Sequence, residues 1–278
     1  MSIGNALILG LVQGIAEFLP ISSSGHLAIL QNMLGLSGTG NDMFFDVLLH
    51  LGTLFAICYV YWEELTQMAT EVRIRLRGGT HIVVDGKRRP LLKERMFVLI
   101  CMSIIPLFLI LPINDYVDAL ATNTLFVGIM LVLTGFILFV ADKMAQGTKT
   151  ERNSTVKDAL FIGLCQCIAV LPGLSRSGVT ITAGMATGHR REYAVKFSLL
   201  MSIPAALGAT LLELVKAIKA GVDVAQIPAY IIGMVVAMVS GVFAIRLIKR
   251  VVHRGNFGGF AYYCWVIGVL AIILTFIV

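Results

Sequence analysis

Apolar residues fill most of this chain, in stretches too long for strands. Six of these stretches are long enough to cross a bilayer of roughly 30 Å as helices of about 20 residues. They lie near residues 44–62, 96–113, 123–141, 197–216, 227–245 and 259–278. The pattern therefore predicts an all-α integral membrane protein with about six transmembrane helices.

Two further apolar stretches, residues 3–36 and 159–188, are each interrupted by a polar segment rich in Pro, Gly and Ser. Non-helical backbone at membrane depth is tolerated only where it is buried in protein or lines a wet cavity. We therefore expect each stretch to form a re-entrant helical hairpin, in which two half-helices enter the membrane and turn back.

The polar segments of the two hairpins are copies of one element. Both begin with Gly-Leu-x-Gln-x-Ile-Ala, from Gly10 and from Gly163, and both end with Ser-x-Ser-Gly, from Ser22 and from Ser175. The copies are 153 positions apart. The sequence thus predicts a single membrane domain of two repeats, 1–141 and 142–278, each with one hairpin and three spans.

The distribution of Lys and Arg indicates how the chain crosses the membrane. Eight lie in the loop between the first two spans, four in 142–158, three in 188–196 and four in 246–254, whereas the loops 37–43 and 114–122 have none. Basic loops stay in the cytoplasm. The net charge of +6 is explained by these loops, so no nucleic-acid partner is expected. Because each half has three spans, the second repeat starts from the opposite face of the membrane and its topology is inverted. The broken helices of such inverted repeats meet near the midplane.

Arg176 is the only one of the 22 Lys and Arg that lies inside a membrane-embedded segment. Ser175 and Ser177 flank it and Gly173 precedes it, so hydroxyls, backbone amides and a half-helix N-terminus surround the guanidinium. Such a set of donors suits a phosphate. The alternative is a structural arginine neutralised by carbonyls or by Glu17.

The first hairpin carries Ser22, Ser23, Ser24 and His26. If the half-helix begins near Ser23, the imidazole of His26 shares a face with the Ser23 hydroxyl and could accept its proton. Alternatively, the serines only cap the half-helix and His26 packs in a wet cavity.

Glu17 lies well inside an apolar segment, one helical turn after Gln13. This pair of oxygen ligands suits Mg²⁺ or Ca²⁺, which also hold phosphate oxygens. The alternative is a salt bridge from Glu17 to Arg176, and both arrangements could form at different stages. Asp46, His50 and Glu213 are interpreted as polar residues at helix ends or in a cavity.

The motif from Gln13 to His26, together with the motif from Pro172 to Thr180, closely resembles the two signature motifs of the bacterial undecaprenyl pyrophosphate phosphatases of the bacitracin-resistance type. The resemblance extends over the whole chain. It implies a phosphatase that converts undecaprenyl pyrophosphate to the monophosphate, recycling the lipid carrier of cell-wall synthesis. It also implies a divalent cation and a multi-pass protein of the bacterial plasma membrane whose site faces outward.

The family's functional positions correspond here to Gln13, Glu17, Ser23, Ser24, His26, Ser175, Arg176, Ser177 and Thr180. Many members have Glu where this chain has Gln13, so the expected site carries one negative charge fewer. The resemblance fits Ser23 as nucleophile with His26 as base, or His26 activating water directly. The competing hypothesis is a transporter or flippase of a lipid phosphate or other anion, built on the same midplane site. The sequence leaves a homodimer open.

Overall fold

The computed structural model describes residues 1–36, 40–84, 87–220, 223–254 and 257–276. The first half contains α1 (Ile3–Phe18), α2 (Ser23–Met33), α3 (Gly40–Val60), α4 (Trp62–Leu76), α5 (Leu92–Ile104), α6 (Asn114–Leu120) and α7 (Thr124–Lys143). The second half contains α8 (Val156–Ile168), α9 (Arg176–Ala186), α10 (Arg191–Ala220), α11 (Ile227–Arg254) and α12 (Gly258–Thr275). Short 3₁₀ helices lie at Ile105–Leu109, Leu111–Ile113 and Val224–Gln226.

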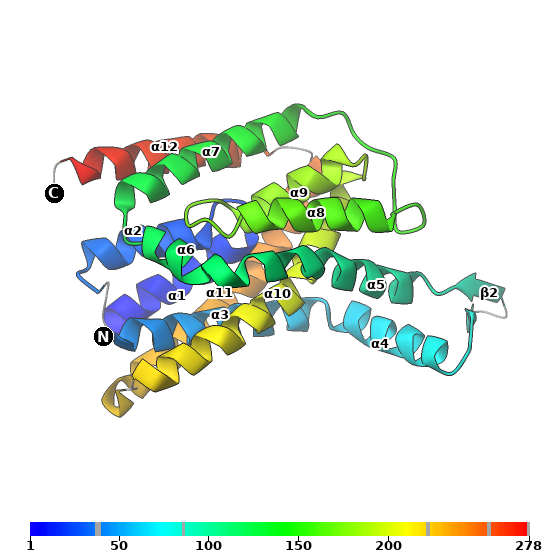
Figure 1. Ribbon diagram of the computed structural model, residues 1–278, viewed down its shortest axis with the longest axis horizontal. Coiled ribbons are helices and arrows are strands. Elements are labelled where there is room, and N and C mark those ends of the chain that lie inside the picture. Colours follow the sequence, from blue (N-terminus) through cyan, green and yellow to red (C-terminus); the bar gives the residue numbers. More distant parts are fainter. Residues whose placement is uncertain (37–39, 85–86, 221–222, 255–256, 277–278) are drawn as a thin grey trace.

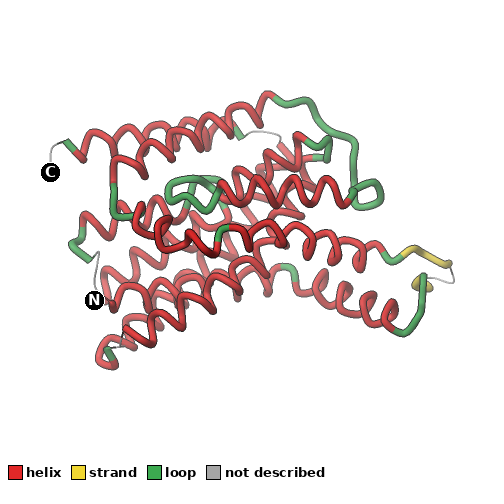
Figure 2. The backbone as a smooth tube through the Cα atoms, in the orientation of Figure 1, coloured by secondary structure: helices red, strands yellow, loops and turns green. Residues whose placement is uncertain are grey.

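The structure is almost entirely helical (Figure 2). Within the described residues, six segments are long and apolar enough to cross a membrane, and each overlaps one predicted span over most of its length. They are Met43–Val60, Leu92–Val117, Thr124–Lys143, Arg191–Lys219, Val224–Val252 and Gly258–Phe276. The predicted all-α membrane fold is confirmed, and the chain is a multi-pass membrane protein. Residues 277–278 of the last predicted span and residues 37–39 of the first predicted loop lie outside the described residues.

Two features of the fold were not expected. The loop after the first span contains the amphipathic helix α4 and an antiparallel hairpin of β1 (His81–Val84) and β2 (Lys87–Pro90). The second span is α-helical only as far as Ile104 and continues through two 3₁₀ helices. Pro106 and Pro112 lie at the start of these 3₁₀ helices, and proline cannot donate the backbone hydrogen bond that an α-helix needs.

The helices approach one another closely where glycine faces glycine. α1 packs along α11, α3 along α10 and α11, and α7 along α12. A Cβ atom added at Gly10 of α1 would lie 2.5 Å from the carbonyl oxygen of Gly233 in α11. One added at Gly268 of α12 would lie 2.8 Å from the carbonyl oxygen of Gly128 in α7. Small residues allow such contacts between helices in lipid, where packing replaces the hydrophobic effect.

The two hairpins have matching boundaries and opposite directions. α1 and α8 begin 153 positions apart, as do α2 and α9 at both of their ends. α1 begins beside the start of α11, where the N-terminal amine donates to Gln226 Oε1 at 2.7 Å. α8 begins at the other end of the molecule (Figure 1), where Arg95 near the start of α5 donates to the carbonyl oxygen of Ser154 at 2.6 Å.

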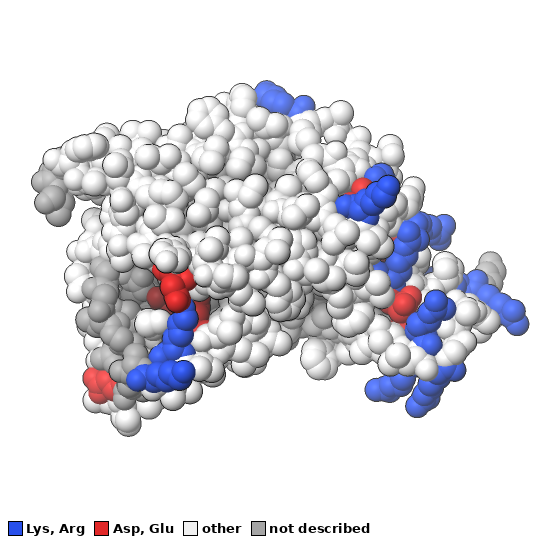
Figure 3. Space-filling view, viewed as in Figure 1, with Lys and Arg blue, Asp and Glu red and all other residues white. Residues whose placement is uncertain are grey.

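Charged side chains lie mainly at the ends of the molecule. On the face shown in Figure 3, Lys and Arg gather at the end that carries α4, α5 and β2, and the middle is almost free of charge. A smaller group of basic and acidic side chains lies at the opposite end in the same view. Lys216 near the end of α10 forms an ion pair with Asp115 of α6, with the two atoms 2.6 Å apart. This separation of charge along the helix axes is typical of a protein that crosses a membrane.

Candidate active site

Each hairpin turns through a serine that caps its second half-helix. Ser22 Oγ accepts from the amide of Gly25 at 3.2 Å, and Ser175 Oγ accepts from the amide of Gly178 at 3.1 Å. Each capping hydroxyl also contacts the serine two positions later, Ser24 or Ser177. The repeat seen in the sequence is therefore a repeat of local structure, and it leaves the first amides of α2 and α9 without intrahelical partners.

Each of the two turns contains one residue with a positive φ, a backbone conformation that residues other than glycine rarely adopt. Ser22 has φ +70°, uncommon for a residue with a side chain, and such strain concentrates at functional sites. Gly173 has φ +94°, and an added Cβ would lie 2.5 Å from the carbonyl oxygen of Val127. The buried hydroxyl of Thr134 donates to the carbonyl oxygen of Gly173 and accepts from the amide of Ser175. α7 thus fixes the tip of the second hairpin.

The tips of the two hairpins meet inside the protein. Ser177 Oγ donates to the carbonyl oxygen of Leu19 at 3.3 Å, and the amide of Gly173 donates to Ser24 Oγ at 3.5 Å. Between them lies a polar cavity of about 50 Å³. It is lined by Ala16, Glu17, Ser22, Ser23, Ser24, Ala169, Leu174, Ser175, Arg176 and Ser177. Seven of the predicted site residues therefore share one cavity, although each hairpin supplies only part of it.

Glu17 is the centre of the hydrogen-bond network at this junction. Its side chain is only 7% exposed, and its carboxylate forms an ion pair with Arg176 of the other hairpin. Ser23 Oγ donates to Glu17 Oε2 at 2.6 Å, and Gln13 Nε2 donates to the same oxygen at 3.2 Å. The sequence left open whether Glu17 pairs with Arg176, and in this structure it does.

The predicted contact between Ser23 and His26 is not formed. The Ser23 hydroxyl donates to Glu17 instead. His26 Nδ1 lies 2.8 Å from the carbonyl oxygen of Ser22, and its Nε2 lies 2.9 Å from the hydroxyl of Tyr263 in α12. An imidazole one helical turn after Ser22 reaches the carbonyl of that turn, so each ring nitrogen of His26 has a partner other than Ser23.

Two other predicted residues lie behind the cavity wall. Thr180 is buried, donates to the carbonyl oxygen of Arg176 at 2.8 Å and lies 2.6 Å from Ser198 Oγ of α10. It therefore supports the turn that carries Arg176. Gln13 is fully buried, and its Oε1 has no hydrogen-bond partner in the described part of the chain.

Gln13 contacts Glu17 through Nε2 and leaves Oε1 without a hydrogen-bond partner among the described residues. Gln13 Oε1 and the Glu17 carboxylate can therefore offer oxygen ligands to a hard cation. No group of three or more His, Cys, Asp or Glu side chains is arranged to hold a metal in the described ranges. A cation here would therefore take its remaining ligands from substrate or water, as Mg²⁺ commonly does.

One neighbour of the site could not be expected from the sequence. Tyr263 contacts His26 from 237 positions away, which no local pattern indicates. His50, interpreted as a helix-end or cavity residue, lies within α3, and its Nδ1 is 2.9 Å from the carbonyl oxygen of Asp46 one helical turn earlier. Asp46, on the same helix, accepts from Gln31 Nε2 at 2.8 Å and thus ties α3 to α2.

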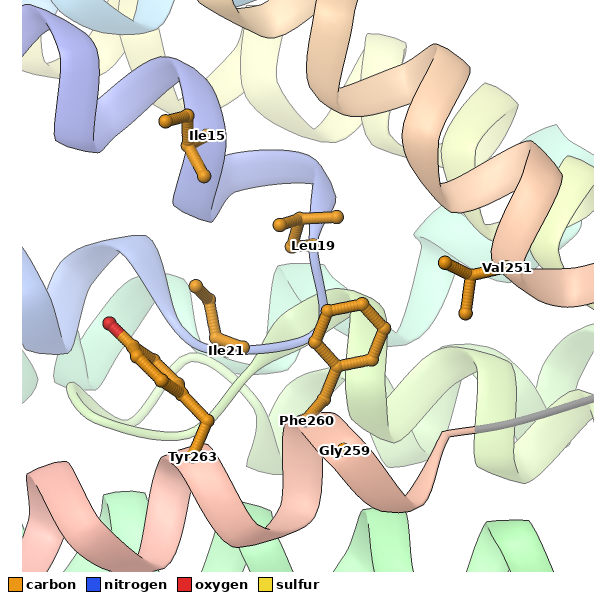
Figure 4. Close-up of a pocket in the computed structure, with 7 residues that line it drawn as sticks. All are labelled: Ile15, Leu19, Ile21, Val251, Gly259, Phe260 and Tyr263. Carbon is orange, nitrogen blue, oxygen red and sulfur yellow. The ribbon is translucent and has the colours of Figure 1, made fainter.

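An apolar groove begins beside the first hairpin (Figure 4). It has a volume of about 610 Å³ and is lined by Ile15, Leu19, Ile21, Val251, Gly259, Phe260 and Tyr263. The lining comes from α1, the turn after it, α11 and α12. Tyr263 is thus shared between the groove and the contact with His26.

Comparison with known proteins agrees with the motifs. The family model of the bacitracin resistance protein BacA matches residues 6–270. The chain belongs to the BacA family. It is 38% identical over 272 residues to an undecaprenyl-diphosphatase of Carboxydothermus hydrogenoformans, covering 97% of this chain and 96% of that protein. It is 37% identical over 282 residues to one of Methanosphaera stadtmanae, covering 99% of both chains. For one of Desulforapulum autotrophicum, the identity is 37% over 285 residues and both chains are covered in full.

Proposed function

We propose that this BacA-family protein is an undecaprenyl-diphosphatase. It removes the terminal phosphate of undecaprenyl pyrophosphate and so returns the lipid carrier of cell-wall synthesis to use. One observation carries the proposal: Glu17, Ser23 and Arg176 meet at a polar cavity between two helix N-termini, in a chain that resembles undecaprenyl-diphosphatases over its whole length.

The cavity is suited to recognise a pyrophosphate. The N-termini of α2 and α9 both open onto it, and each favours an anion through its free amides and its dipole. Arg176 adds a fixed positive charge, and Ser22, Ser24, Ser175 and Ser177 add hydroxyl donors. At about 50 Å³ the cavity is small for two phosphoryl groups. Binding therefore requires Arg176 to leave Glu17 and turn its donors to the phosphate.

The contact between Ser23 and Glu17 suggests how the reaction begins. Ser23 Oγ attacks the terminal phosphorus while Glu17 Oε2, 2.6 Å away, accepts its proton. The bond from that phosphorus to the bridging oxygen breaks, and undecaprenyl phosphate leaves. Water then hydrolyses the phosphoserine to release inorganic phosphate and restore Ser23. In the alternative route, water attacks directly and Ser23 only binds the phosphate. His26, three positions after Ser23, is assigned to activate water: the water that hydrolyses the phosphoserine or, in the alternative route, the water that attacks the pyrophosphate.

Stabilisation of charge contributes most to phosphoryl transfer. Arg176 and the helix amides supply part of it. Glu17 and Gln13 would hold a divalent cation, Mg²⁺ or Ca²⁺, which would neutralise negative charge on the leaving phosphate. Since Gln13 replaces a second carboxylate, such a cation would depend on the pyrophosphate for several of its ligands.

The orientation follows from the charge of the loops. If the basic loops are cytoplasmic, the hairpin of α1 and α2 enters from outside and the site faces the periplasm or exterior of a bacterial plasma membrane. The apolar groove next to the cavity suits the prenyl chain. Both hairpins come from one chain, so the proposal holds for a monomer and for a homodimer alike. Transport without cleavage is not favoured, because the relatives are named as diphosphatases.

The proposal is tested by phosphate release from a C55 or shorter prenyl pyrophosphate, using the purified protein in detergent. We expect release that stops with EDTA and returns with Mg²⁺ or Ca²⁺. Substrate labelled on the terminal phosphate should leave label on the acid-quenched protein, and Ser23→Ala should remove that label. A folded protein that releases no phosphate from any of these substrates would refute the phosphatase. Release without label on Ser23 would favour the route through water.

A further inference from the structure

The two contacts of His26 define which nitrogen carries its proton. Nδ1 lies 2.8 Å from the carbonyl oxygen of Ser22, and a carbonyl can only accept, so Nδ1 is the donor. In the neutral ring Nε2 is then an acceptor. The Tyr263 hydroxyl, 2.9 Å from Nε2, must therefore donate to it. Both nitrogens of the imidazole are thus engaged before substrate arrives.

The tyrosine also fixes the plane of the imidazole. The two rings are stacked, with centroids 5.5 Å apart and planes inclined by only 6°. One side chain therefore both orients His26 and covers Nε2, the only nitrogen that could still accept a proton or approach a phosphate. His26 can act on a substrate through Nε2 only after the hydroxyl of Tyr263 has moved away.

Tyr263 is also part of the wall of the apolar groove. Figure 4 shows its ring beside Ile21, with the hydroxyl directed away from Phe260 and Val251. Tyr263 is 41% exposed, so a hydrocarbon chain in the groove would pack directly against its ring. Side chains of this kind occupy discrete rotamers. A ring displaced by such a chain would carry its hydroxyl off His26.

We propose that Tyr263 is a positioning residue that couples filling of the apolar groove by a prenyl chain to release of His26. The inference rests on the proposed phosphatase and adds to it a dependence of turnover on the lipid. In the empty protein Tyr263 holds Nε2. When the chain fills the groove, Tyr263 turns away and Nε2 becomes available at the site. Short pyrophosphates, which leave the groove partly empty, are therefore turned over more slowly than long ones.

The test compares a C55 with a C15 prenyl pyrophosphate in the wild type and in Tyr263→Phe, which keeps the stacked ring and removes the hydroxyl. We expect the wild type to have a higher kcat on the C55 substrate. Tyr263→Phe should raise kcat on the C15 substrate by about fivefold, the rate equivalent of one hydrogen bond, and leave kcat on the C55 substrate nearly unchanged. Tyr262→Phe is the matched control, because Tyr262 is 59% exposed and packs on Trp265.

Two results would overturn the coupling. An equal fall in kcat on both substrates would mean that Tyr263 only supports the fold or the orientation of His26. If Tyr263→Phe keeps the wild-type ratio of kcat on the C55 substrate to kcat on the C15 substrate, the hydroxyl does not restrain His26. A wild type that releases no phosphate from either substrate would instead refute the phosphatase itself, so the two failures are distinguishable.

A second measurement needs no variant of Tyr263. Farnesol has a prenyl chain but no phosphate, and isopentenyl pyrophosphate has the phosphates but a chain too short to fill the groove. Adding farnesol should accelerate phosphate release from isopentenyl pyrophosphate by wild-type protein. Inhibition, or no change at concentrations that saturate the groove, would contradict the proposal.

Discussion

Replacing Arg176 with glutamine leaves the carboxylate of Glu17 buried without its cation. Removing one partner of a buried ion pair costs about 3–5 kcal/mol. The Arg176 side chain is 26% exposed and the Glu17 side chain 7%, so water screens part of the charge and we expect about 3 kcal/mol. At about 2 °C per kcal/mol for a chain of this size, Arg176→Gln should lower Tm by about 6 °C.

The double variant Glu17→Gln/Arg176→Gln tests the physical reason. It has no unpaired buried charge, so we expect its Tm to be higher than that of Arg176→Gln alone, even though it carries one more substitution. Thermal unfolding of the purified proteins in one detergent measures both. Arg246→Gln, at an exposed position of α11, is the control and should leave Tm nearly unchanged. A double variant that is as unstable as the sum of the single variants would refute the coupling across the two hairpins.

Two further predictions concern the supports of the site. Gly173→Ala should cost about 3 kcal/mol and sharply reduce phosphate release, because φ is +94° and the new Cβ meets the carbonyl of Val127, whereas Gly208→Ala in α10, with nothing within 4 Å, should do neither. Burial alone would raise the pKa of Glu151, but hydrogen bonds and charge from Lys196 and the neighbouring Lys93 hold the pKa below its ordinary 4.5. The stability that Glu151 contributes is therefore present above about pH 4.5 and lost as pH falls through the lower folded value, so Glu151→Gln should lower Tm more at pH 7 than at a pH well below 4.5. An equal effect of Glu151→Gln at both pH values would contradict this explanation.

The elements of the fold could be predicted because their signals are local. Span length and hydropathy locate the six membrane helices, and the repeated Ser-x-Ser-Gly locates the starts of α2 and α9, since a serine cap followed by glycine needs no distant partner. The meeting of Glu17 with Arg176 could be anticipated too, because an inverted repeat brings its two tips together near the midplane.

Side-chain partners within the site could not be predicted in the same way. Ser23 is three positions before His26 on α2, a spacing that predicts a contact within the helix, whereas Glu17 is six positions earlier on α1. The contact of Ser23 with Glu17 depends on the turn at Ser22, whose φ of +70° no sequence rule indicates. The contact of His26 with Tyr263 depends on where α12 packs against the first hairpin. The β-hairpin at 81–90 was missed because its basic residues resemble an ordinary cytoplasmic loop.

The most direct test of the account is phosphate release from undecaprenyl pyrophosphate by wild-type protein and by Arg176→Ala, with folding of both confirmed by size-exclusion chromatography. If the two hairpin tips form one phosphate-binding site, the wild type releases phosphate and Arg176→Ala is slower by a factor of about a hundred or more. Near-normal release by a folded Arg176→Ala protein would contradict the central claim that the arginine of the second hairpin holds the phosphate for the residues of the first.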